Sequence, residues 1–260
     1  MGLAMSNETS VTQAQLRAHA ALQAGFARHP ATRLLLASIL VAHIAVGLVM
    51  LSRGRFTWIG VVVAPRGPRL LSRCGAMNGE LLDAGELWRT VSMIFLHGDG
   101  THIFLNGIAL FALGRLCEAV YGSVRFTWLF LLSGVGGGIF SWLGGNDLSV
   151  GASGGIFGLL GAAFIFGWRH RADLPEPTGA FFRKNLAPWI ALNLFIGIVV
   201  PFIDNLGHTG GLVTGGILAL VLGNRVVPGQ DTGPLAKGGM VLGILFLVGV
   251  AAIGVGGKWL

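Results

Sequence analysis

Of the 260 residues in this chain, 53% are hydrophobic and only 11% are charged, which leaves too few polar side chains to cover a soluble globule of this size. The net charge of +7 could indicate a nucleic-acid-binding protein, but the sequence has no basic stripe with interleaved aromatic residues. We therefore exclude a soluble domain and a nucleic-acid partner, and expect the basic residues, which lie between apolar runs, to contact membrane lipid.

Residues 1–30 are polar and alanine-rich. They contain no short apolar core followed by a small-residue cleavage site, so we expect a cytoplasmic tail and not a signal peptide. A membrane crossing needs about 20 apolar residues in a helix. The sequence predicts seven spans, at residues 34–51, 101–121, 126–143, 153–168, 186–202, 206–222 and 240–255. The expected fold is all-α, a polytopic membrane helical bundle.

The connections between these spans predict the orientation of the chain. The first, residues 53–96, is long, carries six arginines and suits a structure that lies at the membrane interface. The connection 169–184 carries four basic residues, whereas 144–152 carries none. Because short loops rich in lysine and arginine stay in the cytoplasm, we place the N terminus inside and residues 144–152 outside.

Polar side chains recur at one depth of the predicted bundle. The second, fourth and sixth spans all run from outside to inside, and they begin with His102 and Asn106, with Ser153, and with His208. Polar groups inside a span are unfavourable in hydrocarbon and therefore indicate a functional site. Four residues on three helices should lie at one level near the outer surface, where a single pocket could collect them.

Ser153 stands in the segment Gly-Ala-Ser-Gly-Gly, residues 151–155, where a glycine-containing loop enters a helix. Gly151 and Gly154 let a substrate approach the backbone closely, and the helix start offers free amide hydrogens to an oxyanion. These features suit a nucleophile. The alternative is a helix cap followed by a small-residue packing seam along the helix.

His208 lies on a span whose glycines recur at positions 207, 211 and 215, on one helix face. This bare face permits tight contact with another glycine-lined helix, and the fourth span is the expected partner. Such contact would bring His208 near Ser153, where a neutral imidazole can act as general base. The alternative is a histidine that bonds a backbone carbonyl, which is the interpretation that we favour for His43 in the first span.

His102 and Asn106 are four residues apart and share a helix face, so both could donate hydrogen bonds to one developing negative charge. A zinc site is the competing interpretation, but no His-Glu-x-x-His pattern exists. The two cysteines, Cys74 and Cys117, should lie on opposite membrane faces, which disfavours a disulfide and a metal site. We expect no cofactor and no metal.

No carboxylate is obviously placed to orient His208. Asp204 lies in the outer loop four residues earlier, and Glu118 lies at the cytoplasmic end of the second span. We therefore predict a dyad of Ser153 and His208, a variant of the serine protease triad in which geometry matters more than chain order.

Four motifs follow one another over roughly residues 86–222: Trp88-Arg89, the run from His97 through His102 to Asn106, Gly151-x-Ser153-Gly154, and Gly207-His208-x-x-Gly211. Together they resemble the rhomboid family of intramembrane serine proteases. The segment 114–118 also looks like the end of that family's second helix. Phe157 occupies a place where relatives often have tyrosine; it keeps a ring to stack on His208 but lacks the hydroxyl.

The resemblance implies a six-helix protease core at residues 31–223, followed at 224–260 by a Gly- and Pro-rich linker and an additional C-terminal transmembrane helix. It further implies that Ser153 is the nucleophile and His208 its base, that His102, Asn106 and the Ser153 amide form an oxyanion hole, and that Trp88 and Arg89 belong to the interfacial first loop.

The activity implied is hydrolysis of peptide bonds in or beside the transmembrane helices of other membrane proteins. The expected location is the bacterial inner membrane, with the active site toward the outer side. One rival is an inactive relative that binds transmembrane helices without cleaving them. A transporter is another, although the chain lacks an inverted repeat and paired charges within its spans.

Overall fold

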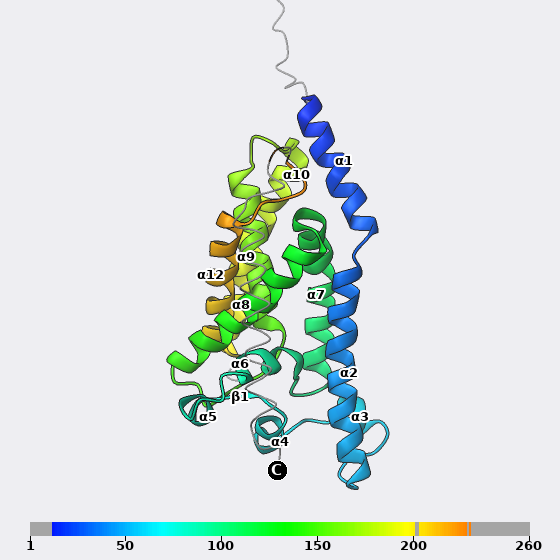
Figure 1. The fold of residues 1–260 in the computed structure, drawn as a ribbon, viewed down its shortest axis with the longest axis vertical. Helices are drawn as coiled ribbons and strands as arrows, with labels where there is room; N and C mark the ends of the chain where they lie inside the picture. Colours follow the sequence, from blue (N-terminus) through cyan, green and yellow to red (C-terminus); the bar gives the residue numbers. More distant parts are fainter. Residues whose placement is uncertain (1–11, 201–202, 228, 230–260) are drawn as a thin grey trace, which may run out of the picture.

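The computed structural model describes residues 12–200, 203–227 and 229. These residues form mainly helices, with two strands of two residues each (Figure 1). In chain order the elements are α1 (Gln13–Ala27), α2 (Pro30–Ser52), α3 (Gly60–Val63), α4 (Pro68–Arg73), β1 (Met77–Asn78), α5 (Gly79–Asp83), α6 (Arg89–Ser92), η1 (Met93–Phe95), α7 (Gly100–Tyr121), α8 (Ser123–Leu143), β2 (Leu148–Ser149), α9 (Ser153–Arg169), α10 (Glu176–Ala180), η2 (Phe181–Asn185), α11 (Leu186–Val199) and α12 (Asn205–Val221).

The long helices are apolar enough to cross a membrane. Among the described residues, three stretches reach both the length and the hydropathy of a span: Gln13–Ser52, Gly100–Tyr121 and Ser123–Leu143. The helices α9 and α11 are apolar but shorter. The prediction of an all-α polytopic membrane bundle is confirmed, whereas the seventh predicted span, residues 240–255, lies outside the described residues.

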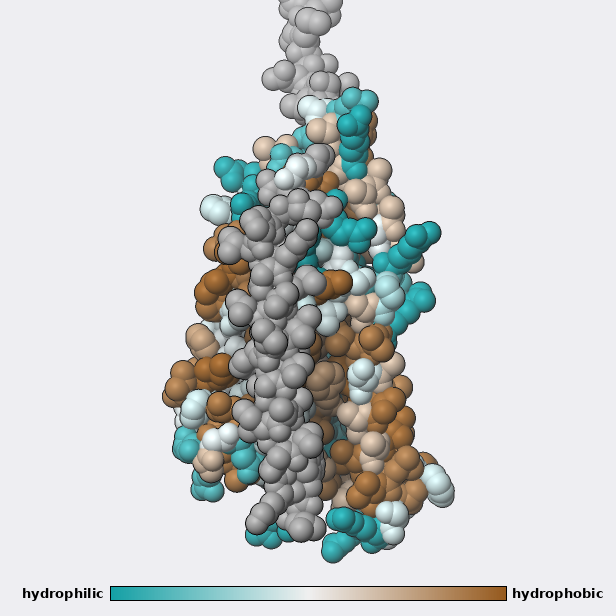
Figure 2. Space-filling model, viewed as in Figure 1, coloured by the Kyte–Doolittle hydropathy of each residue, from teal (hydrophilic) through white to brown (hydrophobic). Residues whose placement is uncertain are grey.

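The side of the bundle is hydrophobic, as a protein surrounded by lipid requires. Figure 2 shows hydrophobic side chains along the middle of the molecule and hydrophilic ones toward its two ends. On α2 the large apolar side chains that remain exposed include Leu34, Leu40, Val41, Leu48 and Val49. In a soluble protein such a stripe would be covered, so lipid is the solvent that fits it.

The first helix, α1, occupies part of the segment predicted to be a tail. Thr12 and Gln15 form a capping box at its start. Near its end, a Cβ atom added to Gly25 would lie 2.7 Å from the Cβ of Ala119, so α1 packs closely against α7. Residues 13–27 are therefore docked on the bundle as a helix.

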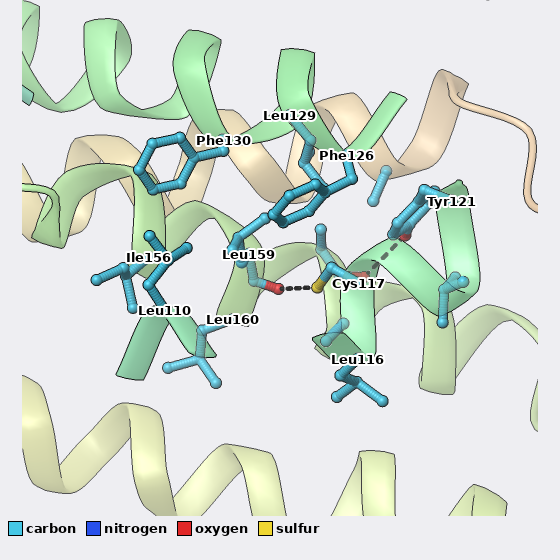
Figure 3. Packing of buried hydrophobic residues seen from close by; sticks show 14 of the residues in the cluster. Leu110, Leu116, Cys117, Tyr121, Phe126, Leu129, Phe130, Ile156, Leu159 and Leu160 are labelled. Atoms are coloured by element: carbon cyan, nitrogen blue, oxygen red, sulfur yellow. Dashed lines mark hydrogen bonds between the residues drawn. The ribbon is translucent and has the colours of Figure 1, made fainter. Parts of the chain in front are cut away.

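The helix α9 lies inside the bundle, packed against α7, α8 and α12 (Figure 1). Figure 3 shows the apolar core at the contact of α7, α8 and α9. Phe126, Phe130 and Leu159 are fully buried there. The thiol of Cys117 donates to the carbonyl of Leu159 at 3.3 Å, and the hydroxyl of Tyr121 donates to the carbonyl of Ala162 at 3.1 Å.

The connections 53–96 and 144–152 are held together by backbone pairing. The strands β1 and β2 are antiparallel, with Met77 opposite Ser149. This pairing ties the long connection 53–96 to the short connection 144–152, which leads into α9. Figure 1 shows β1, α5 and α6 at the end of the bundle where α7 and α9 begin.

Candidate active site

Ser153 is the first residue of α9, at the end of a loop held by two backbone amides. The amide of Gly151 donates to the carbonyl of Met93 at 2.9 Å. The amide of Ala152 donates to Nε2 of His97 at 3.5 Å. Because Ser153 begins the helix, its own amide has no carbonyl within the helix to bond and is free for another acceptor.

The backbone conformation at position 151 explains why this loop needs a glycine there. Its φ angle is +122°, a conformation that other residues rarely adopt. A Cβ atom added there would lie 2.8 Å from Nε2 of His102 and 3.8 Å from Oγ of Ser153. The absent side chain therefore leaves room for the His102 ring beside the serine, and both groups lie within van der Waals reach of one point.

The ring of His208 lies against the helix that carries Ser153. It stacks on the ring of Phe157 with 4.1 Å between centroids and 13° between planes, the arrangement implied by the family resemblance. Phe157 follows Ser153 by four residues and so shares its helix face, one turn further along. The imidazole is thereby placed next to the first turn of α9.

Glycines on α9 and α12 let the backbones of these two helices pack in direct contact. A Cβ atom added at Gly211 would collide with the carbonyl of Gly154, and one added at Gly215 would collide with that of Gly158. The predicted contact between the fourth and sixth spans is confirmed. The helix α8 joins them through Gly137, where an added Cβ would lie 2.6 Å from the carbonyl oxygen of Gly207.

Ser153 and His208 are both partly exposed. No hydrogen bond between them occurs in the described part of the chain, and Nδ1 of His208 is buried without a partner there. Hydrogen bonds between catalytic groups are often long before substrate binds and shorten in the complex. The structure therefore brings the two residues to neighbouring positions without joining them.

His102 and Asn106 lie in the first turns of α7. Asp99 caps this helix by accepting the His102 amide at 2.8 Å. The amide of Gly98 donates to Nδ1 of His102 at 3.4 Å, so we infer that the neutral ring carries its proton on Nε2, the atom near Gly151. The Asn106 side-chain amide donates to the His102 carbonyl at 2.9 Å, which leaves its second hydrogen for another acceptor.

His97 is 1% exposed and packs against the ring of His102. Its ring meets that of His102 edge to face, with 5.0 Å between centroids. Burial, together with repulsion from the His102 ring when that ring is also protonated, lowers the pKa of His97 to about 3. The ring is therefore neutral at physiological pH, and Nε2 can accept the Ala152 amide.

Trp88 and Arg89 lie within the first connection. Arg89 is buried, donates to Glu86 at 2.7 Å, and also donates to the carbonyls of Ser72 and Ala76 at 2.6 and 3.1 Å. Its guanidinium lies 4.7 Å from the centre of the Trp88 ring. These contacts organise the connection itself.

His43 shows the structural role that we favoured for it, since its Nε2 lies 2.9 Å from the carbonyl oxygen of Val62. The two cysteines are free, Cys74 after α4 and Cys117 within α7. Glu118 accepts the backbone amides of Ala31 and Thr32, so its carboxylate binds the start of α2.

Sequence reasoning missed a polar link between the connection 144–152 and the start of α12. Asp204, Asn146 and Ser149 are joined by hydrogen bonds of 2.8 and 2.6 Å. The available signal was the acidic residue just before an apolar helix, which is typical of an N-cap. Nothing in the local sequence indicated that it also binds the loop some fifty residues earlier.

The fold is that of a polytopic helical membrane protein, with a serine, two histidines and an asparagine near the same end of its central helices. A family model, the Rhomboid domain, matches residues 84–225, which is more than half of the chain. The chain belongs to the rhomboid family.

Named relatives include both proteases and proteins described only as rhomboid-like. The chain is 38% identical over 149 residues to Rhomboid protease GluP of Bacillus subtilis (strain 168), which covers 57% of this chain and 29% of that protein. It is 32% identical over 168 residues to Rhomboid protease AarA of Providencia stuartii, covering 56% and 59% of the two chains. RHOMBOID-like protein 5 of Arabidopsis thaliana is 38% identical over 164 residues, covering 60% and 51%. The match thus spans less than two thirds of each of these relatives.

Proposed function

We propose that this protein is an intramembrane serine endopeptidase that hydrolyses peptide bonds in or near the transmembrane helices of other proteins. The observation that carries the proposal is the stacking of His208 on Phe157, one turn from Ser153 on the same helix face. An imidazole stacked at this position, one turn from a serine that begins a helix, supports a pair of general base and nucleophile. Membership of a family that includes named proteases supports the same function.

In the proposed reaction, Oγ of Ser153 attacks the carbonyl carbon of the scissile bond while His208 accepts the hydroxyl proton. The tetrahedral intermediate collapses when His208 returns that proton to the leaving amine, and an ester on Ser153 remains. Water, activated by the same imidazole, then hydrolyses the ester and restores the serine.

The negative charge that develops on the carbonyl oxygen needs donors nearby. The free amide of Ser153, Nε2–H of His102 and the second amide hydrogen of Asn106 are the candidates. The inferred tautomer of His102 supports this role, because the Gly98 amide occupies Nδ1 and leaves the proton on the ring atom near the loop. No metal or other cofactor is required for these steps.

A substrate helix hides its carbonyls in its own hydrogen bonds, so it must unwind locally before Ser153 can attack. We therefore propose that segments with glycine or other weak helix formers near the cut are preferred. We also propose that the N terminus is cytoplasmic and that the site opens toward the outer side of a bacterial inner membrane, where water can enter.

The test is cleavage of a model transmembrane substrate by the purified full-length protein, with mass spectrometry of the fragments. Ser153→Ala and His208→Ala should abolish cleavage and labelling by a serine-directed fluorophosphonate. Ser38→Ala is the matched control, because that exposed hydroxyl bonds only its own helix at Leu34. Equal product from the wild type and Ser153→Ala would refute the proposal, and substrate binding without cleavage would favour an inactive, helix-binding relative.

A further inference from the structure

The carboxylate of Asp204 connects two segments that lead into the candidate site. One oxygen, Oδ1, accepts the backbone amide of Gly207 at 2.8 Å and so caps α12. The same oxygen accepts the side-chain amide of Asn146 at 2.8 Å, and Oδ2 accepts the hydroxyl of Ser149 at 2.6 Å. Asp204 therefore does more than a helix cap requires.

The two ends of this link stand at equivalent positions. Asp204 precedes His208 by four residues, and Ser149 precedes Ser153 by four residues. The hydrogen bond between Asp204 and Ser149 thus joins the start of the helix that carries the histidine to the loop that delivers the serine. Ser149 is only 7% exposed and Asp204 is half-buried, so this charge-assisted bond is partly shielded from water.

The surroundings hold the carboxylate in place. A Cβ atom added at Gly207 would lie 2.5 Å from Oδ2 of Asp204, so glycine is what leaves room for the carboxylate over the first turn of α12. On the loop side, Ser149 is also paired with Met77 through β1 and β2, and Asn146 donates to the hydroxyl of Ser141 at 3.0 Å. The hydrogen bonds of Asp204 therefore join the start of α12 to a loop that its own contacts already hold in place.

We propose that Asp204 is a positioning residue that sets the separation of Ser153 and His208 through its hydrogen bond to Ser149; this inference rests on the proposed protease function. The carboxylate of Asp204 accepts from neither the Ser153 hydroxyl nor the His208 ring; only its backbone carbonyl meets His208, by accepting the backbone amide of that residue at 3.0 Å within α12. It acts by fixing the segments that carry them, and small errors in the placement of reacting groups lower rates strongly.

Two substitutions separate the positioning role from helix capping. In Asp204→Ser, the shorter hydroxyl can still cap α12, since serine is about as good an N-cap as aspartate, but it cannot reach Ser149. Ser149→Ala removes the donor on the loop and leaves the cap intact. Asp204→Asn keeps the cap, and its amide can donate to the Ser149 hydroxyl. Asp147→Ala is the matched control, because Asp147 is an exposed carboxylate of the same connection.

The measurement is the rate of fluorophosphonate labelling of the full-length protein in detergent, well below the thermal unfolding midpoint of every variant. We expect Asp204→Ser and Ser149→Ala to label about tenfold or more slowly, and the double variant no more slowly than the slower single variant. Asp204→Asn should recover most of the rate, and Asp147→Ala should match the wild type.

The inference is overturned if both single variants label at the wild-type rate, if their losses multiply in the double variant, or if Asp204→Asn is as slow as Asp204→Ser. A lowered unfolding midpoint with an unchanged labelling rate would show that Asp204 acts only as the N-cap of α12. Failure of the wild type to label at Ser153 is a separate outcome, because it overturns the proposed function together with the inference.

Discussion

At the scale of single residues, Gly151 couples backbone conformation to the placement of a side chain. Its positive φ and the nearness of the His102 ring are two independent reasons for glycine. The first concerns the loop alone, whereas the second concerns the proposed oxyanion donors. A substitution that separates the two reasons can show whether the ring position matters for chemistry.

We predict that Gly151→Ala lowers the rate of fluorophosphonate labelling at Ser153 at least tenfold, because the new methyl group displaces His102. The matched control is Gly145→Ala, in the same connection, where φ is +81° and an added Cβ meets nothing within 4 Å. Both variants should lose about 1 kcal/mol of stability from backbone strain. Equal labelling by the two variants would show that the His102 position is unimportant.

His97 predicts how stability responds to acid. Burial lowers the pKa of His97 to about 3, while the unfolded chain titrates near the ordinary value of about 6.5. Between these values the unfolded state binds more protons, so stability is complete above about pH 6.5 and falls as the pH drops toward 3. Protonation would also put a hydrogen on Nε2 of His97, which could then no longer accept the amide of Ala152.

We therefore expect the thermal unfolding midpoint of the wild type to fall between pH 7 and pH 4, and to fall less in His97→Gln. The glutamine oxygen can still accept the Ala152 amide, but it has no proton to gain in this range. His19→Gln is the control, since His19 lies on α1 and its ring meets Thr178 in an exposed contact. A pH dependence that is the same in all three proteins would contradict the assignment.

At the scale of elements, the glycine-lined contact between α9 and α12 sets the separation of the helices that carry Ser153 and His208. We predict that Gly215→Ala separates the helices, lowers stability by about 1–3 kcal/mol and reduces cleavage of a model substrate, because the added methyl group meets the rigid carbonyl of Gly158. At the neighbouring Gly216 an added Cβ would lie 3.6 Å from Ile165, an ordinary contact. Gly216→Ala should therefore not lower the unfolding midpoint or reduce cleavage.

The same contact shows what the sequence could predict. Long apolar runs locate the main helices, and glycines at every fourth position indicated which two would touch. The pairing of β1 with β2 and the reach of Asp204 to Ser149 could not be predicted, because two-residue strands and single hydrogen bonds over 55 residues leave no periodic pattern. The α1 helix was missed although Thr12 and Gln15 carry a capping-box signal.

At the scale of the whole molecule, charge and geometry support one orientation. The connection 169–184 is basic and contains α10, which lies at the end of the bundle opposite to β1 (Figure 1). The connection 144–152 has no basic residue and lies beside the candidate site. From the positive-inside bias of these short connections we propose that the basic end lies in the cytoplasm and the candidate site near the outer surface.

This orientation predicts the accessibility of two engineered thiols. In a Cys74→Ala background, Asp147→Cys should react with a membrane-impermeant maleimide applied to the outside of intact cells or spheroplasts. Arg171→Cys, at the opposite end, should react only after the membrane is opened. Cys117 is fully buried and should contribute no background. The reverse pattern would place the site on the cytoplasmic side, and substrates would then have to present their unwound segment to water from within the cell.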